Sequence, residues 1–449
     1  MNFLRKTAWW VLAGTQLLIV VGCWFWFHTH HPMGNLLTGD SIGKLLAWGR
    51  LAGLLAVLAI LFQLMLVGRV RWVERAYGLD RLTRLHHVTG FALIVLLLLH
   101  PVLLALGHGL AADNGFWAQM SEFVRIWEDV LAAAVGLALM LAASVFSVLV
   151  ILKRVRYELW YATHLVLYVA IGLAFLHQVS SGSDFTDHAA FRYYWYALYA
   201  FVIVNLLGYR FVRPALAFFR HRFAVTRVVP EPGDVTSVYI GGRNLERFAI
   251  EAGQFMVVRF LAKGYRWEAH PFSMSCFPDG RQLRLSIKRL GDFTRRVSEL
   301  KPGTPVLIDG PHGIFTARRC ASDKVLLIAG GIGITPVRSL AEELVGAGRD
   351  VVLVYGNRNG QTTVFKDELD ELAARAEGRL RVHYVMSDDP GWSGEKGRID
   401  HDRLARLVPD IAKREVYFCG PPVMRKGIRT ALAGLGVAVQ RIHDERFAL

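Results

Sequence analysis

The most regular pattern in the sequence is a series of six long apolar stretches in the first half of the chain. They cover about residues 8–27, 42–68, 84–107, 129–152, 158–179 and 193–213. Each is close to or above the roughly 20 apolar residues that an α-helix needs to cross a bilayer. The pattern therefore predicts six membrane-spanning helices surrounded by lipid.

After the last apolar stretch, the pattern changes to short strands and amphipathic helices. RFAVTRVV, VTSVYIGG, GQFMVVRF, LRLSIKR and TPVLIDGP are bounded by turn residues, which predicts a small antiparallel β-barrel over about 220–318. From about residue 320, strands alternate with helices, which predicts a doubly wound parallel sheet. We therefore expect three domains: a six-helix bundle (1–215), a β-barrel (216–318) and a Rossmann-like α/β domain (319–449).

Charged residues give the predicted helices an orientation. The chain has 52 Lys and Arg against 37 Asp and Glu, a formal charge of +15. Basic residues gather in MNFLRK, 69–84, 153–156 and 213–222, whereas the loops around 113–129 and 180–187 are acidic or neutral. The positive-inside rule then puts both termini in the cytoplasm. The same alternation explains much of the excess charge, so nucleic acid is not an expected partner.

The first apolar stretch and the cysteines exclude some other interpretations. MNFLRK is similar to the start of a signal peptide, but the run is long and ends in WFWFHTHHP without a small-residue cleavage site, which favours an uncleaved helix. The four cysteines are far apart and form no C-x-x-C pair. They therefore predict no zinc site, no iron–sulfur site and no disulfide framework.

Histidines stand at both ends of two apolar stretches. HHVTGFALIVLLLLH runs from His86 to His100, and HLVLYVAIGLAFLH runs from His164 to His177. Both helices run in the same direction, so the histidines form an inner and an outer layer about 20 Å apart. Two facing imidazoles per layer are what a bis-histidine haem iron requires, so we expect two stacked b-type haems. Histidines bonded across helices, or forming a proton path in a transporter, are the alternatives.

Helical phase refines the choice of ligands. His86 and His100 are fourteen residues apart and fall within about 40° of one helix face, whereas His87 and His100 are about 140° apart. We therefore expect His86, rather than His87, to be the inner ligand. The other stretch has only a thirteen-residue spacing. This predicts a wide turn or kink near Gly172 that brings both of its histidines to the same side.

A glycine-rich loop, GGIGITP, follows the first strand of the α/β region and begins a helix. Glycines let the backbone approach a pyrophosphate, and a helix N-terminus favours its charge. The expected nucleotide-binding residues are Gly330, Gly331, Gly333, Thr335 and Pro336. After the next strand, Asn357 and Arg358 replace the acidic residue that would hold an NAD ribose. Arginine suits a 2′-phosphate, so NADPH is favoured over NADH, with a solvated loop cation as the alternative for Arg358.

Five motifs in the soluble half occur in a characteristic order. They are HPFSMSC (270–276), LGDFT (290–294), DGPHG (309–313), GGIGITP (330–336) and CGPP (419–422). In this order they resemble the ferredoxin–NADP reductase module. Coupled to the paired histidines, residues 80–449 resemble the ferric reductase/NADPH oxidase superfamily in a bacterial-type form. The resemblance implies FAD on the barrel, NAD(P)H on the last domain, and a location in the bacterial inner membrane with both domains in the cytoplasm.

The resemblance also implies roles for individual residues. The flavin and its phosphates would be held by His270, Pro271, Phe272 and Ser273 and by the turn that contains Gly291, Phe293 and Thr294. The nicotinamide would lie beside Cys419, Gly420 and Pro421. Phe447 would cover the flavin ring, and Glu445 would assist proton balance. Cys419, Glu445 and Phe447 are thus the expected catalytic residues.

These predictions combine into an electron relay. NADPH would reduce FAD by hydride transfer, and electrons would then pass singly through the inner and outer haems to an acceptor on the outer face. Oxygen, giving superoxide, is the first choice of acceptor, and a ferric chelate is the second. The alternative function is an electron-supply subunit that reduces a quinone or a partner protein. Oligomeric state has no signal in the sequence.

Overall fold

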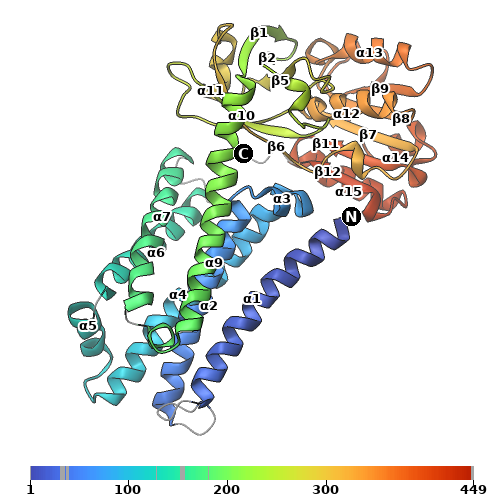
Figure 1. The fold of residues 1–449 in the computed structure, drawn as a ribbon. Coiled ribbons are helices and arrows are strands. Elements are labelled where there is room, and N and C mark those ends of the chain that lie inside the picture. The colour runs from blue at the N-terminus through green and yellow to red at the C-terminus, as the bar shows by residue number, and fades with distance from the viewer. Residues whose placement is uncertain are drawn as a thin grey trace. The chain divides into compact units, whose positions relative to one another are not determined.

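The computed structural model of the chain describes residues 2–30, 36, 40–127, 129–151, 157–180 and 182–445. It divides into two compact units (Figure 1). One comprises Met1–Ala76 and Arg81–Leu207, and the other comprises Tyr77–Asp80 and Gly208–Leu449. The first unit is helical, and the second contains the β-sheets.

The helices of the first unit follow the apolar pattern of the sequence. They are α1 (Asn2–His30), α2 (Ser41–Val67), α3 (Arg71–Tyr77), α4 (Leu79–Ala111), α5 (Phe116–Ile126), α6 (Val130–Ile151), α7 (Tyr157–Ser180), α8 (Ser183–Thr186) and α9 (Ala189–Leu207). Six stretches of the described chain are long and apolar enough to cross a membrane: Thr7–His30, Ser41–Val67, Leu79–Ala111, Val130–Val150, Leu159–Ser180 and Ala189–His221. The six predicted spans are therefore confirmed by length and composition. The last is longer than predicted because η1 (Gly208–Val212), a π-helix, and α10 (Arg213–His221) continue α9.

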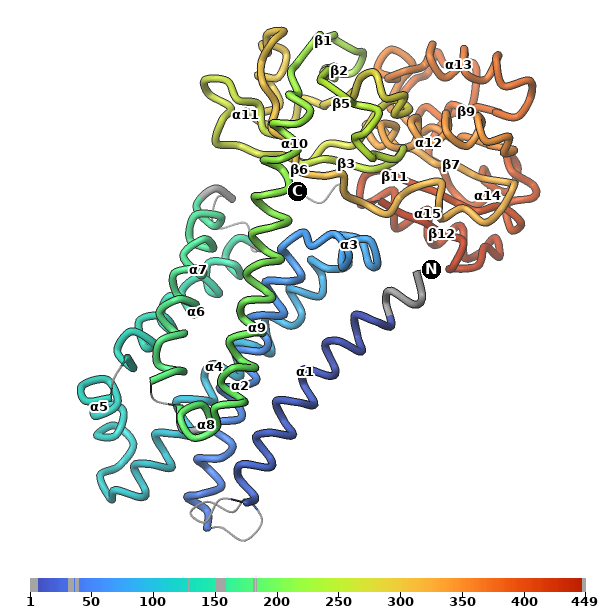
Figure 2. The backbone as a smooth tube through the Cα atoms, viewed as in Figure 1, coloured from blue at the N-terminus to red at the C-terminus, as the bar shows by residue number. Residues whose placement is uncertain are grey.

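Small residues allow close approach between several of these helices. A Cβ atom added to Gly107 of α4 would lie 2.6 Å from Leu46 of α2, and one added to Gly136 of α6 would lie 2.8 Å from the Ala170 carbonyl of α7. Helices in a membrane associate through such small-residue contacts, because lipid supplies no hydrophobic drive between them. The tube in Figure 2 shows α6 and α7 running side by side.

An apolar cluster joins four helices of this unit. Its buried members are Ile60 of α2, Met140 of α6 and Ala170 of α7. Partly buried residues pack against them: Leu93, Leu97, Leu139, Leu167, Ile171 and Ala174. The cluster thus connects α4 to α7 at sequence positions between the two predicted histidine layers.

Two antiparallel three-stranded sheets occupy the region where a barrel was predicted. One has the order β1 (Ala224–Glu231), β2 (Val235–Gly241), β5 (Leu283–Lys288), and the other β4 (His270–Ser273), β3 (Phe255–Phe260), β6 (Val306–His312). Isolated bridges, Ala224 to Pro305 and Met274 to Leu285, connect them. Side chains of both sheets share one buried core, which includes Val238, Leu285, Met256 and Val258.

A six-stranded parallel sheet forms the last part of the chain. Its order is β10 (Glu395–Lys396), β9 (Leu380–Met386), β8 (Asp350–Asn357), β7 (Lys324–Gly330), β11 (Glu415–Cys419), β12 (Ile442–Glu445). The four central strands were predicted, whereas the short β10 and β12 were not. Parallel strands buried on both faces read as continuous apolar runs, which is why β7 and β8 were easy to find.

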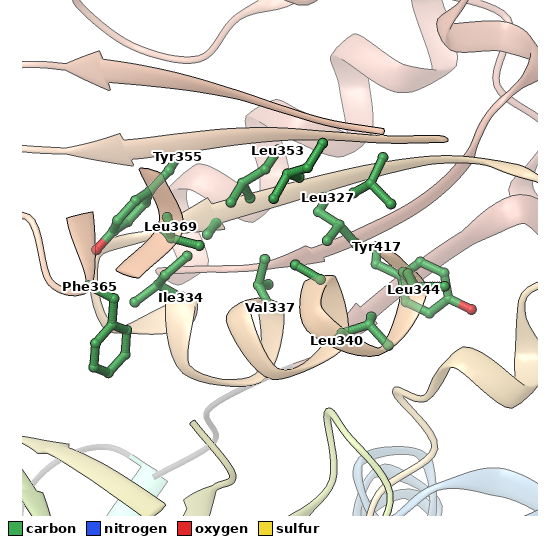
Figure 3. Packing of buried hydrophobic residues seen from close by; sticks show 14 of the residues in the cluster. Leu327, Ile334, Val337, Leu340, Leu344, Leu353, Tyr355, Phe365, Leu369 and Tyr417 are labelled. Carbon is green, nitrogen blue, oxygen red and sulfur yellow. The ribbon is translucent and has the colours of Figure 1, made fainter. Parts of the chain in front are cut away.

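Helices cover both faces of the parallel sheet. Alternate residues of β7 enter different cores: Leu327 packs with α12 (Ile334–Gly346) and α13 (Lys366–Arg375), as Figure 3 shows. Leu326 packs with α14 (His401–Leu407) and α15 (Pro422–Gly434). This arrangement brings the carboxyl ends of β7, β8 and β11 to one edge, where parallel α/β sheets bind ligands.

Candidate functional site

The four predicted histidines form two pairs between α4 and α7. The ring centres of His86 and His164 are 6.2 Å apart, and those of His100 and His177 are also 6.2 Å apart. His87, in contrast, has an exposed side chain. The predicted partners therefore lie together in two layers, with one histidine of each helix in each layer.

The hydrogen bonds of the outer pair determine which ring nitrogen is available. His100 Nδ1 lies 2.8 Å from the Gly49 carbonyl oxygen, and His177 Nδ1 lies 2.7 Å from that of Ala174. A carbonyl oxygen only accepts, so each Nδ1 carries the proton and donates. Each Nε2 is then a free lone pair, and an outer-shell carbonyl on the other nitrogen is what metal-ligating histidines usually have.

The spacing of both pairs fits an iron atom held by two imidazoles. Two metal–nitrogen bonds of about 2 Å, with about 1 Å from each nitrogen to its ring centre, separate the ring centres by about 6 Å. The inner pair supplies a second observation: among the described residues, the buried Nδ1 atoms of His86 and His164 have no hydrogen-bond partner. A buried polar atom without a partner in the protein indicates that a bound group belongs there. The four residues therefore fit two bis-histidine haems.

The predicted turn or kink near Gly172 is wrong. α7 is one uninterrupted α-helix from Tyr157 to Ser180, and its two histidines still reach their partners on α4. Two positions about 140° apart on a helix lie about 70° to either side of a common direction. The long imidazole side chains of His164 and His177 can therefore both turn toward α4 without a change in the backbone.

Two glycines of α2, which were not among the predicted site residues, make room for the outer pair. A Cβ atom on Gly53 would lie 2.6 Å from Nδ1 of His100, and one on Gly49 would lie 2.9 Å from the side chain of Leu104. Gly49 also provides the carbonyl that His100 binds. The signal was available, because a small-x-x-x-small spacing in an apolar helix marks a close helix contact.

The predicted flavin-binding residues form one group at the edge of the β4–β3–β6 sheet. The rings of His270 and Phe293 are 4.1 Å apart, and His270 Nε2 lies 3.4 Å from a carboxylate oxygen of Glu268. Phe293 is buried, Ser273 is buried, and Pro271 is exposed. Phe272 lies 6.3 Å from Phe293 in a stacked arrangement. Phe293 is therefore a core residue that packs against β4 through His270 and Phe272.

The turn at Gly291 is held by a side chain of the short helix that follows it. Thr294 Oγ1 accepts hydrogen bonds from the backbone N–H groups of Leu290 (2.8 Å) and Gly291 (2.9 Å). Arg296 in α11 (Asp292–Arg296) binds Glu268, with 3.2 Å between the nearest nitrogen and oxygen. The turn is thus fixed beside His270, through Phe293 and Glu268.

The glycines of the GGIGITP loop have different tasks. Side-chain atoms on Gly330 and Gly333 would collide with Met424 and with the Cys419 carbonyl, respectively. Gly331 has a φ of +52°, and a Cβ there would meet nothing within 4 Å. Of these three glycines, only Gly331 therefore faces open space. Gly330 makes room for Met424 of α15, and Gly333 makes room for the end of β11. Pro336 and Thr335 are buried in the first turn of α12.

The two predicted residues at the end of β8 differ in whether their side chains are bound within the protein. Asn357 Nδ2 donates to the Thr362 carbonyl at 3.0 Å, so its amide supports the loop. Arg358 has an exposed side chain, and no ion pair of its guanidinium is found in the described part of the chain. Of the two predicted residues, Arg358 is the one whose charge is available for a phosphate.

The predicted residues near the C-terminus lie on adjacent strands. Cys419 at the end of β11 pairs in register with Glu445 of β12 and with Ala329 of β7. Burial raises the pKa of the Cys419 thiol well above its ordinary value, and the nearby Glu445 carboxylate adds to this. The thiol therefore stays protonated at neutral pH. Gly420 and Pro421 continue the loop from β11 into α15, and Phe447 lies outside the described residues.

An ion-pair group that no sequence pattern indicated connects the antiparallel sheets to the fold of the parallel sheet. Arg284 of β5 is 4% exposed and binds Glu368 of α13 through two nitrogens, at 2.8 and 3.0 Å. Arg338 of α12 binds Glu368 at 2.7 Å, and both arginines donate to the Ser275 carbonyl. Burial opposes the charge of Glu368, but the hydrogen bond from Arg284 and the charge of Arg338 lower its pKa overall.

Replacing Glu368 with glutamine should lower the free energy of unfolding by roughly 1–3 kcal/mol, since Arg284 would keep a buried charge without its partner. Because the pKa of Glu368 is lowered in the folded chain, the stabilisation is present above about pH 4.5 and is lost as pH falls. Thermal unfolding at pH 7 and pH 4 measures this. Glu371→Gln, on the exposed side of α13, is the control; equal melting temperatures for both variants would contradict the prediction.

Comparison with known families divides the chain into three matched segments. Residues 52–175 match the ferric reductase like transmembrane component, residues 220–315 match an FAD-binding domain, and residues 327–430 match an oxidoreductase NAD-binding domain. The first match includes three of the four histidines and ends just before His177. The chain matches a ferric reductase/NADPH oxidase-like superfamily.

Three individual relatives each match about half of the chain. The glycine betaine monooxygenase reductase subunit of Pseudomonas aeruginosa is 28% identical over 51% of this chain, and a flavohemoprotein of Burkholderia sp. is 31% identical over 50%. The chain spans 64% and 58% of the lengths of these two proteins, respectively. The flavohem-like FAD/NAD-binding domain of nitric oxide dioxygenase from Vibrio cholerae is 25% identical, with a TM-score of 0.44, and the match covers 50% of this chain and 98% of that one.

The three family matches show an FAD-binding and an NAD-binding domain beside a ferric-reductase-like segment, the parts that an NAD(P)H-driven oxidoreductase contains. The six membrane-capable helices and the ferric-reductase-like segment support an integral membrane protein. The resemblance proposed from the five motifs is thereby confirmed at the level of the superfamily.

Proposed function

We propose that the chain carries electrons from cytoplasmic NADPH, through FAD and two stacked b-type haems, to an acceptor on the outer face of the membrane. Oxygen, with superoxide as product, is the first acceptor, and a ferric chelate is the second. The observation that carries the proposal is the presence of two histidine pairs, each 6.2 Å apart, on two membrane-capable helices. A structural role for one pair would be ordinary, but two pairs with the same spacing favour a relay.

The haems would supply one-electron chemistry, and the protein would hold and separate them. His86 with His164, and His100 with His177, would be the axial ligands. Between the layers, Leu93, Leu97, Leu167 and Ile171 provide apolar side chains from both helices. These residues exclude water from the path and keep polar groups out of it.

At the soluble end, residues of both folds would position the flavin and the nicotinamide. His270, Pro271, Phe272 and Ser273 would line the flavin edge, and the Gly291 turn, fixed by Thr294, would receive the FAD phosphates. Gly331 would leave room for the nucleotide phosphates, beside Thr335 and Pro336. Cys419, Gly420 and Pro421 would border the nicotinamide. Glu445, which pairs in register with Cys419, would hold or release a proton near the flavin, and Phe447 would cover the ring.

The kind of protein found among the relatives favours a second function. Several are reductase components of oxygenase systems, such as the ferredoxin–NAD(P)+ reductase component of the naphthalene dioxygenase system of Ralstonia sp.. In this second function the chain supplies electrons to a quinone or a partner protein.

For both functions, the proposed location of the chain is the bacterial inner membrane, with the flavin and nucleotide domains in the cytoplasm.

A difference spectrum and an acceptor screen test the proposal. Purified protein, reduced by NADPH without oxygen, should show a bis-histidine b-type haem signal equivalent to two haems per chain. Reduction of cytochrome c that superoxide dismutase abolishes would identify oxygen as acceptor, whereas insensitive reduction of a ferric chelate would identify iron. Activity restored only by a quinone would favour the second function. Absence of haem in protein that contains FAD would refute the relay.

The preference for NADPH depends on Arg358. Replacing Arg358 with serine should raise the KM for NADPH about tenfold, corresponding to roughly 1.4 kcal/mol, and leave the KM for NADH almost unchanged. The reason is that only NADPH carries the 2′-phosphate that an arginine would bind. Steady-state ferricyanide reduction with each nucleotide measures this. Equal changes in both KM values would show that Arg358 acts on the loop rather than on the phosphate.

A further inference from the structure

Gln178 is a buried amide that directly follows the outer histidine of α7. Its side chain is 8% exposed, and its Oε1 accepts hydrogen bonds from Trp195 Nε1 at 3.1 Å and from the Tyr199 hydroxyl at 3.3 Å. An indole N–H only donates, so these contacts define the orientation of the amide. The Nε2 group therefore points the other way, toward the backbone of α7.

The side-chain N–H of Gln178 and the ring N–H of His177 both donate to the same carbonyl oxygen. Gln178 Nε2 lies 2.9 Å from the Ala174 carbonyl oxygen, and His177 Nδ1 lies 2.7 Å from it. In the α-helix the Ala174 carbonyl also accepts the backbone N–H of Gln178, four residues further on. Three donors therefore compete for the two lone pairs of one oxygen. Gln178 thereby limits how strongly Ala174 can bind the N–H of His177.

The inner layer has a buried glutamine with a different contact. Gln63 of α2 is 7% exposed, and its Nε2 donates to the His86 carbonyl at 3.0 Å rather than to an oxygen shared with a ring nitrogen. The Nδ1 atoms of His86 and His164 have no partner in the parts of the chain that are described. The two layers therefore differ in how their ligands are hydrogen-bonded.

We propose that Gln178 is a positioning residue that raises the midpoint potential of the outer haem. The inference rests on the proposed function, because it requires a haem between His100 and His177. An imidazole whose N–H is strongly bound is a more basic ligand, and a more basic ligand stabilises ferric iron and lowers the potential. By sharing the Ala174 carbonyl, Gln178 weakens this effect and keeps the outer haem a better acceptor for electrons from the inner one.

Redox titration of the full-length protein in detergent tests the proposal. Gln178→Met removes the competing N–H from a side chain of similar length, and the midpoint potential of one of the two haem components should fall while the other stays. Gln16→Met is the matched control, because Gln16 of α1 also accepts a hydrogen bond from α9, from the Tyr194 hydroxyl at 2.7 Å. Neither potential should move in the control.

A second variant covers the case in which Gln178→Met does not fold. Tyr199→Phe removes one of the two donors that hold the amide of Gln178, so it should lower the same potential by a smaller amount. Two haems with potentials equal to those of the unmodified chain, in either variant, would overturn the inference and leave the proposed function intact. Unmodified protein that contains FAD but no haem would overturn both.

Discussion

Replacing His177 with alanine should remove one of two haems and reduce electron transfer to an external acceptor by at least about 100-fold. The reason is that the outer iron would lose one of its two axial ligands, because His177 is the histidine whose ring lies 6.2 Å from that of His100. His100→Ala should have the same effect. Flavin reduction by NADPH without oxygen should keep its rate in both variants, since it takes place before the haems. Haem content by pyridine haemochrome and stopped-flow absorbance of the flavin measure the two quantities.

The chain provides a matched control for this experiment. His87 is adjacent to His86, but its side chain is exposed and its helical phase differs from that of the outer ligand. His87→Ala should therefore retain both haems, whereas His86→Ala should lose the inner one and stop electron transfer to the acceptor. If His87→Ala loses a haem and His86→Ala does not, the assignment of the inner ligand is wrong. If every single variant retains two haems, none of the four histidines is essential.

Replacing Gly53 with alanine should also deplete the outer haem, although it alters no ligand. The added methyl group would lie 2.6 Å from Nδ1 of His100, a contact that requires the ring or the helix to move. Overpacking of this kind costs roughly 1–3 kcal/mol, which corresponds to a loss of haem affinity of about 5- to 150-fold. Haem content after dialysis against apomyoglobin measures the loss.

The higher helix propensity of alanine opposes a general loss of stability, so the experiment measures the contact with His100 selectively. Alanine stabilises a helix interior by about 1 kcal/mol relative to glycine, so a general loss of stability is not expected. Gly22→Ala in α1 is the control, because a Cβ atom there would meet nothing within 4 Å. Both variants should express equally well, and only Gly53→Ala should lose haem. Equal haem retention would show that the ring of His100 can yield without cost.

The sequence predicted those parts of the molecule that depend on local pattern. The length of the apolar stretches predicted the six spans, short continuous apolar runs predicted the strands β7 and β8, and histidine spacing predicted both layers. The kink near Gly172 was wrongly predicted because a helical wheel treats each side chain as a fixed direction. His164 and His177 instead reach their partners from a continuous helix by rotation of their side chains, and the periodicity of a sequence contains no information about such rotation.

Contacts between distant segments could not be predicted in the same way. Arg284 and Glu368 are separated by 84 positions, and each looks like an ordinary charged residue in its own segment. The sharing of the Ala174 carbonyl depends on Trp195 and Tyr199, which fix the amide of Gln178 from another helix. Tertiary geometry alone supplies these facts. The glycines of α2 are intermediate, because their spacing was visible but their partner was not.

The contact between α2 and His100 has a consequence for the order of assembly. A chain is synthesised from its N-terminus, so α2 and α4 can come together before α7 has been made. Gly49 and Gly53 would then already hold the ring of His100, with its Nε2 left open. Helix α7, which is made later, carries both His164 and His177 on one continuous helix. Both layers are therefore completed when this single helix docks. We therefore expect fragments that end before α7 to insert in the membrane without retaining either haem.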